Sequence, residues 1–129
     1  MNSIKEKMKS SKTIMIVDDE EDIRNTVKEI LLKNGFKVNT ALNADDCLKK
    51  IKTKSSTPDL ILMDIMMPGT PVRDIIPKLS PLKVAYLSVV KTTEAEKEKL
   101  TKEKNVVGFI QKPFDVDDLI SKIKKIMKA

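Results

Sequence analysis

Short apolar runs alternate along this chain with longer stretches in which apolar residues recur every three or four positions. The runs at 13–17 and 60–63 are too short for helices and predict strands buried on both faces. The stretches at 20–33, 44–52 and 116–127 have helical spacing. Parallel strands need crossover helices of this kind, so the pattern predicts an α/β sandwich around one central parallel sheet.

The alternation predicts five strand–helix units in one domain. The predicted strands are 13–17, 36–41, 60–63, 83–90 and 106–110, and the predicted helices are 20–33, 44–52, 72–76, 92–103 and 116–127. We expect the third helix to be short or irregular and to break or end at Pro77, because proline disrupts a helix interior. Residues 1–11 are polar, lysine-rich and without period, which predicts a basic flexible tail ahead of a domain at 12–129.

Composition narrows the class of protein. The 129 residues include 25 basic and 19 acidic ones, a net charge of +6. The lysines are spread over many segments and aromatic residues make up only 3%, which favours solvated helix faces over a nucleic-acid surface. One cysteine and no histidine exclude an internal disulfide and histidine-based catalysis. No apolar run has the length of a membrane span or a secretory signal, so we expect no membrane contact and a cytoplasmic protein.

Candidate chemistry gathers where the predicted strands end. The carboxyl ends of parallel strands share one edge of the sheet, and open α/β sheets bind their ligands there. That edge receives Asp18 and Asp19 after the first strand and Asp64 within LILMDIMMPG (60–69). It also receives Ser88 after the fourth strand and Lys112 after the fifth.

This set of residues suits phosphoryl transfer to a carboxylate. Clustered carboxylates repel one another, and a hard divalent cation such as Mg²⁺ relieves that repulsion through oxygen ligands. A metal and a lysine can neutralise phosphoryl oxygens while a carboxylate attacks in line. Each residue alone has a plainer interpretation, as a helix cap, a turn, a solvated lysine or a strand-end hydroxyl. Their joint occurrence at one edge carries the prediction.

Four motifs resemble one family. They are IMIVDDEEDIR (14–24), LILMDIMMPG (60–69), VAYLS (84–88) and GFIQKPF (108–114). From about residue 12 onward the chain resembles the response-regulator receiver domains of two-component signalling, in particular single-domain receivers of the chemotaxis-regulator kind. The resemblance implies a flavodoxin-like (βα)5 three-layer sandwich with strand order 2-1-3-4-5.

The resemblance also implies roles for site residues. Asp64 would be the phospho-acceptor, loaded from a sensor histidine kinase or a phosphotransfer protein. Mg²⁺, with Mn²⁺ as an alternative, would be bound by Asp19 directly, by Asp18 through water, by Asp64 and by the Met66 carbonyl. The remaining implied roles are Ser88 as the hydroxyl switch residue, Phe109 as the switch aromatic, Lys112 as a phosphate contact and Pro113 as the residue after a cis peptide bond.

The implied output is a change of the surface formed by the helix at 92–103, the strand at 106–110 and the last helix. That surface would bind a downstream output protein, with the receiver monomeric or in a weak phosphorylation-dependent dimer. No catalysis beyond its own phosphorylation and dephosphorylation is expected. Two alternatives stay open: a pseudo-receiver without productive phosphorylation, and a metal-dependent α/β phosphohydrolase.

Three apolar residues depart from the usual receiver pattern. Met66 follows the acceptor by two positions, where many receivers carry a polar residue. Val89 and Val90 follow Ser88, where a small residue is usual first. We hypothesise that these apolar flanks slow hydrolysis of the acyl phosphate.

Overall fold

The computed structural model describes residues 12–53, 57–88, 94, 98 and 101–128. The predicted tail and most of the predicted helix at 92–103 therefore lie outside the described residues, as do Val89 and Val90. In chain order the elements are β1 (Thr13–Val17), α2 (Glu21–Lys33), β2 (Lys37–Ala41), α3 (Ala44–Lys52), β3 (Leu60–Met63), α4 (Val72–Leu79), β4 (Val84–Ser88), β5 (Val106–Gln111) and α6 (Val116–Lys128).

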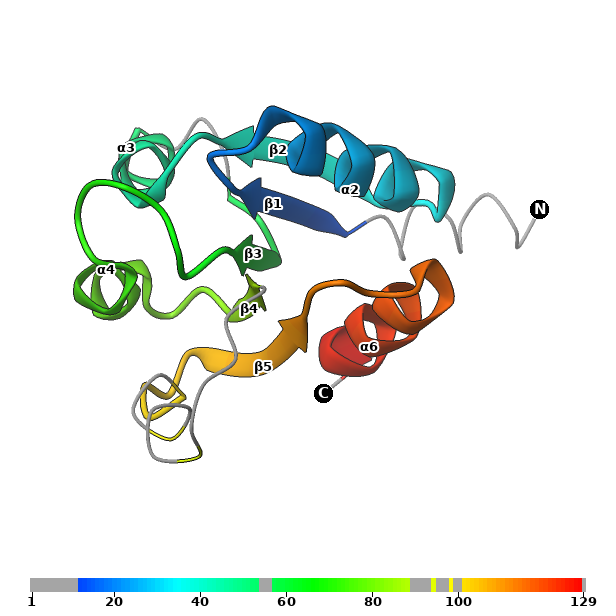
Figure 1. Ribbon diagram of the computed structural model, residues 1–129. Coiled ribbons are helices and arrows are strands. Elements are labelled where there is room, and N and C mark those ends of the chain that lie inside the picture. Colours follow the sequence, from blue (N-terminus) through cyan, green and yellow to red (C-terminus); the bar gives the residue numbers. More distant parts are fainter. Residues whose placement is uncertain (1–11, 54–56, 89–93, 95–97, 99–100, 129) are drawn as a thin grey trace.

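The five strands form one parallel sheet in the order β2-β1-β3-β4-β5 (Figure 1), which confirms the predicted fold and strand order. The strands β1 and β3 lie inside the sheet. Every residue of β3 is buried, and in β1 only Thr13 is partly exposed. β2 lies at one edge and has several half-buried positions, as its alternating sequence predicts.

Helices cover both faces of the sheet, and each face has its own core (Figure 1). On one face Ile14 and Ile16 of β1 share a core with buried residues of α2 and α6, among them Leu31 and Ile123. On the other face Met15 and Val17 share a core with α3 and α4. Successive strand side chains point to opposite faces, which is why one apolar run supplies both cores.

The third helix is short, as predicted, but differs from the prediction at Pro77. The expected break at Pro77 is wrong, because α4 runs from Val72 through Pro77 to Leu79. Pro77 lacks an N–H, so it removes one helical hydrogen bond. Ile76 and Leu79 flank the proline and are both buried in the core shared with α3, and this burial outweighs the lost bond.

The structure at the helix ends agrees with the capping residues in the sequence. The Asn43 side chain accepts a hydrogen bond from the Asp46 N–H at 2.8 Å and so caps α3. Gly35, after α2, has φ of 88°, a backbone conformation that glycine adopts without strain. The peptide bond before Pro113 is cis, as the resemblance implied, and the bond before Pro81 is also cis. Among the described residues, no helix combines the length and apolarity needed to cross a bilayer.

The one cysteine is a core residue. Cys47 in α3 is fully buried, and burial raises the pKa of its thiol to about 12. The thiol is therefore neutral near pH 7 and acts as a small apolar side chain, as the helical spacing around it predicts.

Candidate functional site

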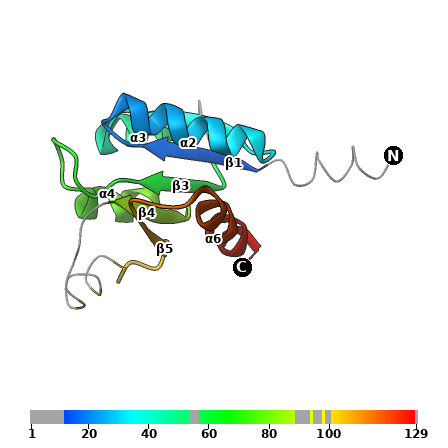
Figure 2. The same cartoon turned by 45° about the vertical axis from the view of Figure 1, so that its right-hand side comes forward.

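The carboxyl ends of the strands bring the predicted site residues together. Asp18 and Asp64 directly follow β1 and β3, which are paired in register up to Val17 and Met63. Lys112 directly follows β5 at the same edge. Figure 2 shows β1 and β3 side by side and pointing the same way, so their ends meet at one side of the molecule.

One ammonium group joins the two aspartates at the centre of this edge. Lys112 Nζ lies 2.7 Å from Asp18 Oδ2 and 3.6 Å from Asp64 Oδ2. The three residues are only 7%, 1% and 5% exposed. Buried charges are tolerated when they are paired and hydrogen-bonded, so the lysine compensates the charge of the carboxylates.

Backbone hydrogen bonds hold both carboxylates in place. Asp18 Oδ1 accepts from the Glu20 N–H at 2.9 Å, and Asp64 Oδ1 accepts from the Met66 N–H at 3.1 Å. Each aspartate thus binds the backbone two residues further on, which fixes the turn that leaves its strand. Arg24 adds a hydrogen bond from its Nη1 to the Asp18 carbonyl at 2.8 Å and so ties α2 to the end of β1.

A cluster of acidic oxygens lies beside these residues. Asp18, Asp19 and Glu20 can each offer one carboxylate oxygen, with all three oxygens within 4.8 Å of one another. Oxygen ligands at this spacing suit a hard cation such as Mg²⁺, which needs few protein ligands because it keeps several waters. Asp19 and Glu20 are exposed, so this side of the site is open to solvent. The residues present therefore fit the metal that the sequence implies.

The two predicted switch residues lie on the neighbouring strands β4 and β5. Ser88 is the last residue of β4 and pairs in register with Gln111 of β5. Phe109 of β5 is partly buried, and its ring packs edge-on against Tyr86, with ring centroids 6.2 Å apart and an interplanar angle of 62°. Tyr86 itself is buried, so the inner side of the Phe109 ring contacts the core.

The loop after the acceptor is apolar and partly open. Met66 is 64% exposed and lines a surface hollow of about 470 Å³ together with Ile65, Met67, Pro68, Gly69 and Pro71. Gly69 has φ of 101°, and the Thr70 N–H donates to Asp45 Oδ2 at 3.5 Å, which links this loop to the start of α3. An apolar loop therefore borders the Asp64 carboxylate on one side.

Sequence reasoning missed three contributors to this site: Glu20, Arg24 and Tyr86. Glu20 and Arg24 stand in the quoted motif at 14–24, but a charged residue near a helix start is commonly a dipole or solvation feature. Tyr86 stands in a buried strand, where its partner depends on the β4–β5 register. The acidic run was a usable signal for Glu20, whereas no local pattern singles out Tyr86.

The fold and this edge define a class of protein: a doubly wound α/β domain with an acidic, lysine-containing site at the carboxyl ends of its strands. Residues 14–124 match the response regulator receiver domain family, and the chain belongs to this family. Receiver domains of this family are signalling switches.

Curated relatives and solved structures agree with this family. The chain is 30% identical over 116 residues to sporulation initiation phosphotransferase F of Bacillus subtilis, an alignment covering 88% of the chain and 92% of that protein. It is 29% identical to the alkaline phosphatase synthesis transcriptional regulatory protein PhoP of the same organism, covering 92% of the chain but only 49% of that longer protein. The response regulator TrrA of Thermotoga maritima, solved in complex with Mg²⁺-BeF, superposes with a TM-score of 0.75 at 29% identity, covering 89% and 98% of the two chains.

Proposed function

We propose that Asp64 accepts a phosphoryl group in a Mg²⁺-dependent reaction and that the phosphorylated domain binds an output protein. The observation that carries the proposal is the Lys112 ammonium between the buried carboxylates of Asp18 and Asp64. An ammonium held at the acceptor is placed to neutralise the phosphoryl oxygens that arrive there. The acceptor carboxylate is held in place by a hydrogen bond within its own turn.

In the proposed transfer, an Asp64 carboxylate oxygen forms a bond to phosphorus while the bond from phosphorus to the donor breaks. The donor is a phosphohistidine of a sensor kinase or a phosphotransfer protein, and the electron pair of the broken P–N bond stays on the histidine nitrogen. Asp19, Asp64 and the Met66 carbonyl would hold Mg²⁺ directly, and Asp18 would hold it through water. The metal, when bound, supplies positive charge to the phosphoryl oxygens. The relative TrrA was solved in complex with Mg²⁺-BeF, which supports the choice of metal.

The proposed response is a rearrangement at Ser88 and Phe109. Ser88 would turn toward the phosphoryl group and Phe109 would move with it, changing the surface formed by residues 92–103, β5 and α6. Phe109 is only partly buried where it packs against Tyr86. Its ring can therefore change position without exposing the core. We place this switch in the cytoplasm, where its kinase domain partners would reach it, and assign the domain no activity on external substrates.

Phosphorylation from acetyl phosphate tests the proposal. The full chain is incubated with acetyl phosphate with and without Mg²⁺, and the intact mass is measured. We expect one added phosphoryl group in the presence of Mg²⁺ and none in Asp64→Asn. The matched control is Asp74→Asn, which changes an exposed aspartate of α4 and should leave the addition intact.

Two other outcomes would contradict the proposal, and each would support a different function. If beryllofluoride with Mg²⁺ leaves the amide resonances around Asp64 unchanged and acetyl phosphate adds no mass, the domain is a pseudo-receiver that binds partners without phosphorylation. Multiple turnover on an external phosphoester, lost in Asp64→Asn, would make it a phosphohydrolase.

A further inference from the structure

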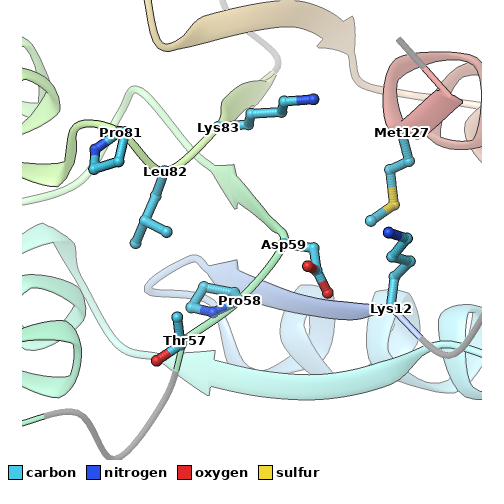
Figure 3. A pocket seen from close by; sticks show the side chains of 8 residues that line it. All are labelled: Lys12, Thr57, Pro58, Asp59, Pro81, Leu82, Lys83 and Met127. Carbon is cyan, nitrogen blue, oxygen red and sulfur yellow. The ribbon is translucent and has the colours of Figure 1, made fainter.

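A second hollow lies at the opposite edge of the sheet, where the strands begin (Figure 3). It has a volume of about 310 Å³, at the lower end of the range for small-molecule sites. Asp59, in its floor, and Asp64 are separated by the four residues of β3. At the rise of a strand this places the hollow roughly 16 Å from the proposed acceptor.

The floor of the hollow is fixed by hydrogen bonds. The Thr13 N–H donates to Asp59 Oδ2 at 2.8 Å, and the Asp59 N–H donates to the Thr13 carbonyl at 2.7 Å. On the next strand the Ile61 N–H donates to the Lys83 carbonyl at 2.9 Å. The hollow is therefore preformed, and one oxygen of Asp59 is already engaged by the protein backbone.

Its walls combine apolar and basic side chains, with Leu82 and Met127 at opposite ends of the hollow in Figure 3. Leu82 and Met127 are half-buried and extend the two separate cores, one from each face of the sheet, to this edge. Lys12 and Lys83 also line the hollow and are exposed. In Figure 3 the Lys12 side chain extends toward Met127, while Lys83 reaches across the other side of the opening.

Positive charge extends beyond the hollow along the same edge. Lys37 begins β2 next to β1, and Lys104 shortly precedes β5, so four of the five strands begin at or just after a lysine. Among the described residues that line the hollow or adjoin these lysines in the sequence, the acids are Asp59, whose Oδ2 is hydrogen-bonded, and Glu103 beside Lys104. Within the described residues, Lys12 makes no ion pair. The edge therefore attracts anions.

We propose that this hollow binds a small organic acid with an apolar body. Its carboxylate would lie between the Lys12 and Lys83 ammonium groups, and its apolar part would extend along the hollow from Met127 toward Leu82. Residues 1–11 carry three lysines and one glutamate, so their charge matches that of the hollow and disfavours them as the occupant. The site lies at the far end of the sheet from Asp64 and is independent of phosphorylation.

Backbone amide shifts of the full chain, followed by NMR, test the site with three probes. Hexanoate has the proposed combination of carboxylate and apolar body, acetate has the carboxylate alone, and hexylammonium has the opposite charge. We expect hexanoate to give saturable shifts at Thr13, Asp59, Leu82 and Lys83, with acetate and hexylammonium giving none there. Equal shifts with acetate or hexylammonium, or hexanoate shifts scattered over the whole surface, would overturn the proposal.

A pair of matched variants gives the second test. The double variant Lys12→Gln with Lys83→Gln removes both proposed ion pairs to the hexanoate carboxylate. Because these pairs are exposed, the Kd for hexanoate should rise about tenfold. The control Lys122→Gln changes an exposed lysine of α6 that does not line the hollow and should leave the Kd unchanged. These substitutions are on the surface, so the rest of the amide spectrum should stay in place. An unchanged Kd in the double variant would rule out the lysines as the anion-binding groups.

Discussion

Lys112 Nζ lies closer to Asp18 Oδ2, at 2.7 Å, than to Asp64 Oδ2, at 3.6 Å. The tighter partner of the lysine is thus a proposed metal ligand and not the proposed acceptor. A cation held at Asp18 through water would share that carboxylate with the lysine. Metal binding would therefore loosen the Lys112–Asp18 contact and leave the ammonium available to the acceptor side.

Replacing this lysine should destabilise the fold. Lys112→Met leaves the buried carboxylates of Asp18 and Asp64 without their positive partner, and breaking a buried pair in this way costs about 3–5 kcal/mol. Urea unfolding at pH 7 without metal measures this loss, with Lys122→Met as the exposed control. Added Mg²⁺ should restore more stability to Lys112→Met than to the wild type, because it supplies the missing charge. A loss below about 1 kcal/mol would mean that water already reaches the carboxylates.

The glycine on β5 should disfavour a methyl group to a small, measurable extent. A Cβ built on Gly108 would lie 2.8 Å from Ile126 Cδ1 of α6 and 3.5 Å from its Cγ1. Gly108→Ala should therefore cost only about 0.5–1.5 kcal/mol, because Cδ1 is the free end of the half-buried Ile126 side chain, which can leave its preferred rotamer to make room. Ile126→Val removes the clashing Cδ1. The double variant should therefore lose less free energy of unfolding than the sum of the losses in the two single variants. Additive losses in the unfolding free energy would argue that the α6 side chain is not the obstacle.

The lone tyrosine offers a pH test. Burial raises the pKa of Tyr86 to about 12 from 10.0, with Glu103 adding to the shift. Its stabilising contribution is therefore complete below pH 10 and declines as the pH rises toward 12. Since the chain has one tyrosine, the tyrosinate absorbance reports on this residue alone. We expect Tyr86 to titrate near 12 or with unfolding, whereas titration near 10 in the folded protein would contradict its burial.

The acyl phosphate should be long-lived. Met66 lies beside the acceptor with an apolar, 64% exposed side chain, and no polar group is offered at that position to guide an attacking water. Mass spectrometry after removal of acetyl phosphate, with Mg²⁺ retained, measures the rate of loss. Met66→Asn should hydrolyse faster than the wild type, and a wild-type half-life of seconds would refute the hypothesis.

The sheet and the edge that carries the site were predictable because both follow from the pattern of apolar residues along the chain. The apolar runs at β1 and β3 are buried on both faces, and a residue that ends such a run must lie at the carboxyl edge. That rule placed Asp18 and Asp64 at one edge, and Lys112 was expected there because it follows the fifth parallel strand.

What could not be predicted depends on packing between distant segments. The continuation of α4 past Pro77 follows from burial of Leu79, which local propensity does not reveal. The contact of Tyr86 with Phe109 follows from the β4–β5 register, which includes an irregularity at Val84 and Ala85. The hollow at the amino edge joins four separate segments of the chain, so no single stretch signals it.

The helices run opposite to the strands and give the two edges of the sheet different charge. α2 and α3 begin beside the acceptor edge with Glu21, Asp22, Asp45 and Asp46 in their first turns, and they end at the far edge with lysines. These charges, together with the lysines that precede the strands, give the molecule a permanent electric dipole moment along its strands. In the field of a charged partner such a molecule rotates before it makes contact. A basic partner surface would meet the Asp64 end first, and salt that screens the field would slow that encounter.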